Sequence, residues 1–218
     1  MTWQAGAAGV AGLVVGWLVW LAAEHFVAHY RVDTLDAKPL DAREFPLLAA
    51  ATLAFMMLWG AYVGWQASEL TVVVAALVVT ALLLCISLVD FQVRRIPNPL
   101  VASLLVWAAV QLAWLQQPGL PAALIGLLIG GGLFLTLRFA SRGTMGMGDV
   151  KLEAALGALL GFPVILSAIL LGVIAGGIAA ALLLITRRAG RKDPIAYGPY
   201  LALGAWLVLL QTWGLWPG

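Results

Sequence analysis

The sequence predicts an all-α protein, a polytopic bundle of about eight membrane helices, one of them short, with the N-terminus outside. The first reason is composition: of 218 residues, 63% are hydrophobic and only 10% are charged, whereas soluble domains carry about 25% charged residues. The second is a series of apolar runs long enough to cross about 30 Å of hydrocarbon. The third is that basic residues fall on one side of these runs.

Each predicted span follows from one apolar run. Complete runs lie at 4–23, 46–66, 70–89, 99–116, 120–139 and 199–215. The stretch 152–186 would measure about 50 Å as one helix, which is too long for a single span. Proline ends or kinks a helix, so Gly161-Phe162-Pro163 divides this stretch into a short helix at about 150–161 and a full span at 164–186.

The basic residues test this arrangement. With the N-terminus outside, the outer loops 66–69, 117–119 and 161–163 contain no Lys or Arg. All basic residues then fall on the cytoplasmic side, as the positive-inside rule requires: Arg31, Lys38, Arg43, Arg94, Arg95, Arg138, Arg142, Lys151, Arg187, Arg188, Arg191 and Lys192. The chain 1–218 is therefore expected to form a single membrane domain, with a short cytoplasmic loop at 24–45.

Several classes of function are disfavoured by composition. A net charge of +2 is too small to indicate nucleic-acid binding. Cys85 is the only cysteine, so neither a disulfide within the chain nor a cysteine-based zinc cluster is expected. His25 and His29 are four residues apart and could bind a metal together with Glu24, but we favour ordinary interface residues. We therefore expect no metal and no cofactor.

Two aspartates stand where a predicted span meets the cytoplasm. Asp90 ends the run 70–89, and Asp149 opens the short helix at 150–161. Carboxylates at such positions are energetically costly and indicate function. Two carboxyl groups held close together cannot both ionise, so one keeps a proton while the other can activate a water molecule. The sequence leaves open which of the two carries the proton.

Structural roles are the alternative for each carboxylate. Asp149 could cap the short helix, and Asp90 could pair with Arg94 or Arg95. The residues beside Asp149 favour the functional interpretation, because Gly146 and Gly148 lack side chains and would let a substrate backbone approach closely.

A third acidic residue follows in the same helix. Glu153 lies four residues after Asp149, on the same helix face, and is a candidate third carboxylate of the site. The alternative is an ion pair with Lys151 or another nearby basic residue.

Residues 43–210 resemble the type IV prepilin peptidases, membrane aspartic proteases of the Gly-x-Gly-Asp class. Four segments carry the resemblance, in order: Arg43-Glu44-Phe45-Pro46-Leu47; Asp90 with Ile96-Pro97-Asn98; Met145-Gly146-Met147-Gly148-Asp149-Val150-Lys151-Leu152; and Ile195-Ala196-Tyr197-Gly198-Pro199-Tyr200-Leu201. The resemblance implies that Asp90 and Asp149 are the catalytic residues, with Gly146, Gly148, Lys151, Pro97 and Asn98 as supporting motif residues.

The resemblance also implies a substrate and a location. The substrate would be a prepilin or pseudopilin precursor with a short basic leader that ends in glycine and precedes a hydrophobic helix. Cleavage would occur at the cytoplasmic face of the bacterial inner membrane. The partners would be this precursor and the lipid bilayer.

The chain departs from the family pattern near its N-terminus. The loop 24–45 contains none of the Cys-x-x-Cys pairs with which many members bind zinc. The first-span motif of the family is replaced around Gly16-Trp17-Leu18-Val19-Trp20. Because these parts accompany the N-methyltransferase activity of many members, we expect a peptidase without that activity.

Two other functions fit a membrane protein with paired carboxylates. A proton- or cation-coupled transporter would need polar residues through the whole membrane thickness, and the predicted spans contain few and no acidic residue at mid-membrane. An inactive pilus-assembly partner would not need both aspartates. We therefore favour the peptidase.

Overall fold

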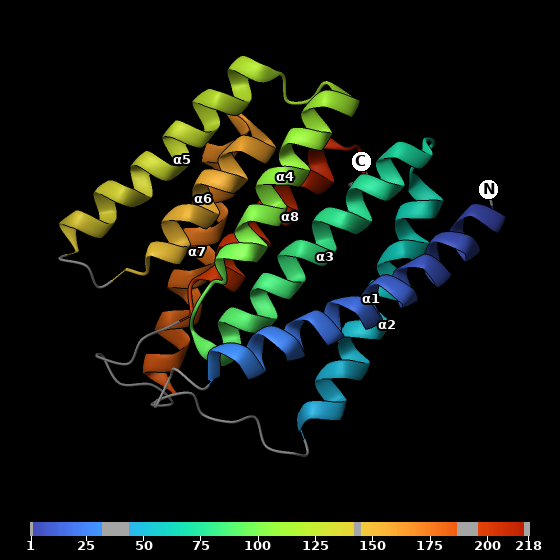
Figure 1. Ribbon diagram of the computed structural model, residues 1–218, viewed down its shortest axis with the longest axis horizontal. Helices are drawn as coiled ribbons and strands as arrows, with labels where there is room; N and C mark the ends of the chain where they lie inside the picture. The colour runs from blue at the N-terminus through green and yellow to red at the C-terminus, as the bar shows by residue number, and fades with distance from the viewer. Residues whose placement is uncertain (1, 32–43, 142–144, 187–195, 216–218) are drawn as a thin grey trace. The chain divides into compact units, whose positions relative to one another are not determined.

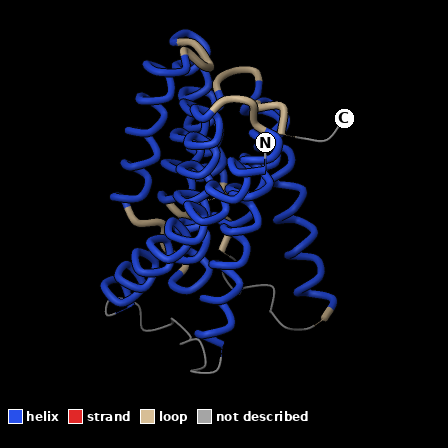
Figure 2. Tube along the Cα trace, turned by 90° about the vertical axis from the view of Figure 1, so that its right-hand side faces the viewer, coloured by secondary structure: helices blue, strands red, loops and turns tan. Residues whose placement is uncertain are grey.

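The computed structural model describes residues 2–31, 44–141, 145–186 and 196–215, and within these ranges all repetitive structure is helical (Figures 1 and 2). In order, the helices are α1 (Thr2–Arg31), α2 (Glu44–Gln66), α3 (Leu70–Val93), α4 (Asn98–Leu115), α5 (Leu120–Ala140), α6 (Met147–Leu160), α7 (Val164–Ile185) and α8 (Gly198–Thr212). For the described part of the chain, the predicted all-helical fold with eight helices is confirmed.

Six helices, α1 to α5 and α7, are long and apolar enough to cross a membrane, and α8 is a shorter apolar helix. With 14 residues, α6 is about 21 Å long and cannot span the hydrocarbon layer. This is the short helix that the break at residues 161–163 predicts.

The helix that contains the predicted first span, 4–23, is longer than that apolar run. Helix α1 continues to Arg31 and α2 begins at Glu44, while residues 32–43 lie outside the described part of the chain. The orientation, with the N-terminus outside, stays a prediction.

The chain divides into two compact units, Met1–Val93 with Leu210–Gly218 and Arg94–Leu209. In the first unit, α1 packs along α2, and both helices contact α3. Backbone approaches backbone between α1 and α2: a Cβ on Gly12 would overlap the Met56 carbonyl, and one on Gly60 would overlap the Ala8 carbonyl.

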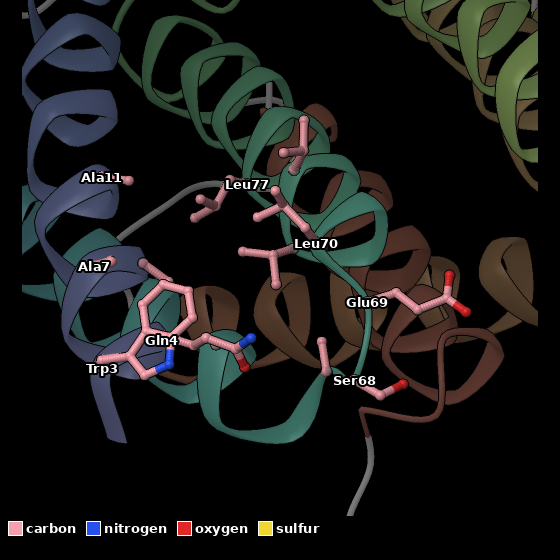
Figure 3. A pocket seen from close by; sticks show the side chains of 13 residues that line it. Trp3, Gln4, Ala7, Ala11, Ser68, Glu69, Leu70 and Leu77 are labelled. Carbon is pink, nitrogen blue, oxygen red and sulfur yellow. The ribbon is translucent and has the colours of Figure 1, made fainter. Parts of the chain in front are cut away.

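The first unit also contains a cavity of about 330 Å³, lined by α1, the end of α2 and the start of α3 (Figure 3). Its walls are mainly apolar, with Trp3, Gln4 and Glu69 among the lining residues. Leu77, the last lining residue on α3, lies about 20 Å along the helix axis from Asp90. This cavity is therefore separate from the surroundings of Asp90.

In the second unit, α6 packs against α4, α5 and α7. The contact with α5 is the tightest, because a Cβ on Gly126 would overlap the Gly157 carbonyl and a Cβ on Gly157 would overlap the Gly126 carbonyl. One turn further along α5, a Cβ on Gly130 would overlap the Glu153 carbonyl. The spacing of Gly126 and Gly130 thus marks a true helix contact, as small residues four apart do in membrane helices.

The α5–α6 contact predicts a position-specific effect of a single methyl group. Gly126→Ala should lower the free energy of unfolding by about 1–3 kcal/mol, because the added Cβ overlaps the backbone of α6. The matched control is Gly132→Ala in the same helix, where nothing lies within 4 Å of the added Cβ. Thermal unfolding in one detergent compares the variants, and equal effects at the two positions would contradict this packing.

Candidate functional site

The motif Met145–Leu152 forms the N-terminal end of α6 and the two residues before it. Gly146 is the N-cap, with φ −64° and ψ 143°, and α6 begins at the next residue. Asp149 is the third helical residue, and its carboxylate accepts a hydrogen bond from the Gly146 backbone. A residue at this position of a helix commonly bonds back to the N-cap N–H. A Cβ on Gly146 would lie only 3.1 Å from Asp149 Oδ2, so glycine leaves room for this arrangement.

The electrostatics of Asp149 differ from those of an exposed helix cap. It lies outside the six candidate membrane-spanning helices. Burial raises the pKa of Asp149 from an ordinary 3.8 to about 6, against the opposite effect of the Gly146 hydrogen bond. A simple exposed cap would lower the pKa, because hydrogen bonds favour the ionised form. A pKa raised into this range is one that acid–base catalysis near neutral pH uses.

The segment that follows Asp90 in the sequence meets the Asp149 motif. The Lys151 Nζ donates a hydrogen bond to the Asn98 Oδ1 at 2.9 Å. A Cβ on Gly148 would lie 3.0 Å from the Ile96 Cβ, so the glycine allows this segment to pack closely. Pro97 is buried and is the N-cap of α4. The second unit thus brings together Asn98, Gly148, Asp149 and Lys151.

Glu153 is buried in the same helix. Its side chain is 1% exposed, and its Oε2 has no hydrogen-bond partner. Burial raises the pKa of Glu153 to about 8, and the charge of Asp149 adds to this effect. The alternative of an ion pair with Lys151 is not supported, because Lys151 donates to Asn98 and residues two apart in a helix do not face each other.

Arg138 contacts the Asp149 motif, a contact that the sequence analysis did not identify. It lies in the last turn of α5, and its guanidinium donates a hydrogen bond to the carbonyl of Met145, the first residue of the motif. This hydrogen bond therefore helps to hold the segment just before α6 in place. The available signal was a single basic residue ending an apolar helix, which we interpreted only as a marker of topology.

Asp90 lies in the last turn of α3 and is 4% exposed. The helix ends three residues later, and Arg94 has a left-handed φ of 52°. Burial at the end of an apolar helix is consistent with a functional carboxylate. Asp90 belongs to the first unit and Asp149 to the second, so their pairing stays a prediction from the sequence.

Within the described ranges, no group of three or more His, Cys, Asp or Glu side chains could hold a metal ion. His25 and His29 are exposed on α1, and Glu24 Oε1 accepts a hydrogen bond from Trp20 Nε1 at 2.7 Å. Of the late segment, Ile195 lies outside the described residues, and Tyr197 and Tyr200 meet edge to face with ring centroids 6.4 Å apart.

Comparison with known proteins identifies a family that this chain resembles. A family model described as the type IV leader peptidase family matches residues 77–181, a range that includes both Asp90 and Asp149. The chain is 34% identical over 186 residues to a prepilin leader peptidase/N-methyltransferase of Pseudomonas aeruginosa, covering 82% of this chain and 61% of the relative. No solved structure matches the chain.

A protein of the same name from Xanthomonas campestris pv. campestris is 31% identical over 187 residues, covering 82% of this chain and 62% of the relative. The one from Stutzerimonas stutzeri is 32% identical over 180 residues, covering 79% and 60%. The chain thus spans about three fifths of the length of these relatives. With the family model, the matched range and these identities in agreement, the chain belongs to the type IV leader peptidase family.

Proposed function

We propose that this chain is an intramembrane aspartic endopeptidase that removes the N-terminal leader from type IV prepilins or pseudopilins. The observation that carries the proposal is Asp149, a partly buried carboxyl at the start of α6 with a pKa raised to about 6. Its helix is joined to the segment following Asp90 by the Lys151–Asn98 hydrogen bond. The names of the relatives support the substrate class, since each is a prepilin leader peptidase.

The proposed mechanism uses Asp90 and Asp149 as a pair that shares one proton. The ionised carboxylate takes a proton from water, and the resulting hydroxyl adds to the carbonyl carbon of the scissile peptide. The protonated partner gives its proton to the carbonyl oxygen. Collapse of this gem-diol breaks the C–N bond, and the leaving amine receives the proton that came from water. One of the two gem-diol protons returns to the second carboxyl, which restores the starting state, and the other stays on the new carboxylic acid.

The proposed site of cleavage is the cytoplasmic face of the bacterial inner membrane. This follows from the positive-inside pattern, in which the ends of α3 and α5 and the start of α6 lie on the side that holds the basic residues. A leader with basic residues would stay on that side, while the hydrophobic helix after it remains in the bilayer.

We further propose that the chain lacks N-methyltransferase activity. The support is the absence of Cys-x-x-Cys pairs in the loop between the first two spans, since Cys85 is the only cysteine. The relatives are named as both peptidase and N-methyltransferase, so the peptidase assay should also contain labelled S-adenosylmethionine. Label on the new N-terminus would overturn this part of the proposal.

Loss of either aspartate should abolish cleavage. Asp90→Asn and Asp149→Asn are each expected to reduce kcat/KM at least about 100-fold, because each removes a group that transfers a proton. The assay uses the purified full chain in lipid with a prepilin-type peptide, and mass spectrometry locates the cut. Glu69→Gln, a carboxylate beyond the far end of α3 from Asp90, is the control and should retain activity. Full activity in either aspartate variant would refute the pair.

The Lys151–Asn98 hydrogen bond should appear as energetic coupling. In a double-mutant cycle with Lys151→Ala and Asn98→Ala, we expect a coupling energy of about 0.5–1.5 kcal/mol in kcat/KM, the range of a single hydrogen bond. Ser103→Ala is the control partner, because its hydroxyl, also on α4, donates to the Pro99 carbonyl instead. Strict additivity of the Lys151 and Asn98 effects would contradict the contact.

The raised pKa of Asp149 predicts how stability depends on pH. The unfolded chain ionises this carboxyl near pH 3.8, whereas the folded chain does so only near pH 6. Stability from the protonated form is therefore present below pH 3.8 and is lost as pH rises to about 6. Asp149→Asn cannot ionise, so its melting temperature should rise relative to wild type across this window. A constant difference from pH 4 to 7 would contradict the pKa shift.

A further inference from the structure

The second carboxyl of α6, Glu153, is the feature of the second unit that the proposed mechanism leaves unused. It follows Asp149 by four residues, so the two Cβ atoms are neighbours on one helix face at about 5–6 Å. The side chain is 1% exposed, and its Oε2 is buried without a hydrogen-bond partner. A buried polar atom without a partner is costly, and its retention calls for an explanation.

The helices around Glu153 offer it no positive charge. Neither α4 nor α7 contains an Asp, Glu, Lys, Arg or His. The only ionisable residue of α5 is Arg138, whose guanidinium donates to the Met145 carbonyl. On α6 itself, Lys151 donates to Asn98. Among the described residues of this unit, the charged group that acts on Glu153 is therefore Asp149, which has the same sign.

Two carboxyl groups at this spacing, in surroundings of low polarity, do not both ionise, because their negative charges would repel each other. Asp149 is the more exposed of the two, and its carboxylate accepts the Gly146 backbone hydrogen bond, which favours the charged form. Glu153 is deeper and lacks such a donor at Oε2. As pH rises, Asp149 should ionise first, and its charge should then keep the proton on Glu153.

We propose that Glu153 is a positioning residue that stays protonated while Asp149 is ionised, so that the two carboxyls of α6 carry one negative charge between them. This inference rests on the proposed peptidase function. It assigns Asp149 the role of taking the proton from water, and Asp90 the role of giving a proton to the carbonyl oxygen. Ionisation of Glu153 at alkaline pH would place a second negative charge beside Asp149 and lower activity.

The pH profile of cleavage tests the role of Glu153. In the full chain reconstituted in lipid, Glu153→Gln keeps the shape and the neutral form of the side chain at every pH. The variant should therefore stay active at neutral pH, with its alkaline limb of kcat/KM moved upward by about 1 pH unit, a typical shift between interacting groups. Glu69→Gln should leave the limb unchanged. A Glu153→Gln profile that superimposes on wild type would overturn the inference.

A measurement without substrate separates this inference from the proposed function. Infrared difference spectra of the Asp90→Asn chain, which lacks the other protonated carboxyl, should show a protonated carboxyl band at neutral pH that disappears near pH 8. Adding Asp149→Asn should move the titration of the same band to lower pH, because the neighbouring charge is absent. This comparison does not need the Glu153→Gln variant to fold. An unmoved band, or no band, would overturn the inference. Absence of wild-type cleavage with the band present would overturn the peptidase function alone.

Discussion

The backbone contact between α5 and α6 determines where the polar groups of the second unit lie. Gly126 and Gly157 let the two helices touch at their backbones, and Gly130 gives the same closeness at the peptide of Glu153. Any larger side chain at these positions would push α6 outward, and Asp149 and Glu153 would move with it. Close packing is a main source of attraction between helices in a bilayer, where the hydrophobic effect does not act between them, so these glycines contribute directly to the position of α6.

The other supports of α6 depend on that placement. At its entrance, Arg138 holds the Met145 carbonyl from α5, and Lys151 reaches Asn98 at the start of α4. Further along, Gln111 of α4 donates to the Leu159 carbonyl near the end of α6, at 3.4 Å. One of these bonds joins the segment before α6 to α5, and the other two join α6 to the start and the later part of α4. The short helix is therefore held along its length although it is too short to span the membrane.

Much of this arrangement could be predicted from the sequence, for identifiable reasons. Long apolar runs and one proline break specify helices, so the eight helices, including the short α6, could be predicted. The importance of Asp149 followed from the cost of a carboxylate in apolar surroundings. The end of α1 could not be predicted. Glu24, His25 and His29 make residues 24–31 look polar, although the helix continues to Arg31.

The hydrogen-bond partners of side chains were harder to predict, because they depend on which helix faces meet. Lys151 could have paired with a carboxylate, and only the approach of α4 to α6 gives it Asn98 as a partner. Arg138 was equally ambiguous, since an arginine that ends an apolar helix also serves as a topology signal. Nothing local in the sequence links it to Met145, seven residues later and beyond a break in the helix.

The choice of partners for the two cations has a chemical consequence. Lys151 binds an amide oxygen and Arg138 binds a backbone carbonyl, so both are satisfied by neutral acceptors. Neither Asp149 nor Glu153 has its pKa lowered by a neighbouring cation. An ion pair to Asp149 would have favoured its charged form and lowered its pKa by roughly 1–3 units. A carboxylate held permanently ionised in that way could accept a proton from water only weakly. Leaving the carboxyls without cations keeps their proton affinities in the range that peptide hydrolysis near neutral pH requires.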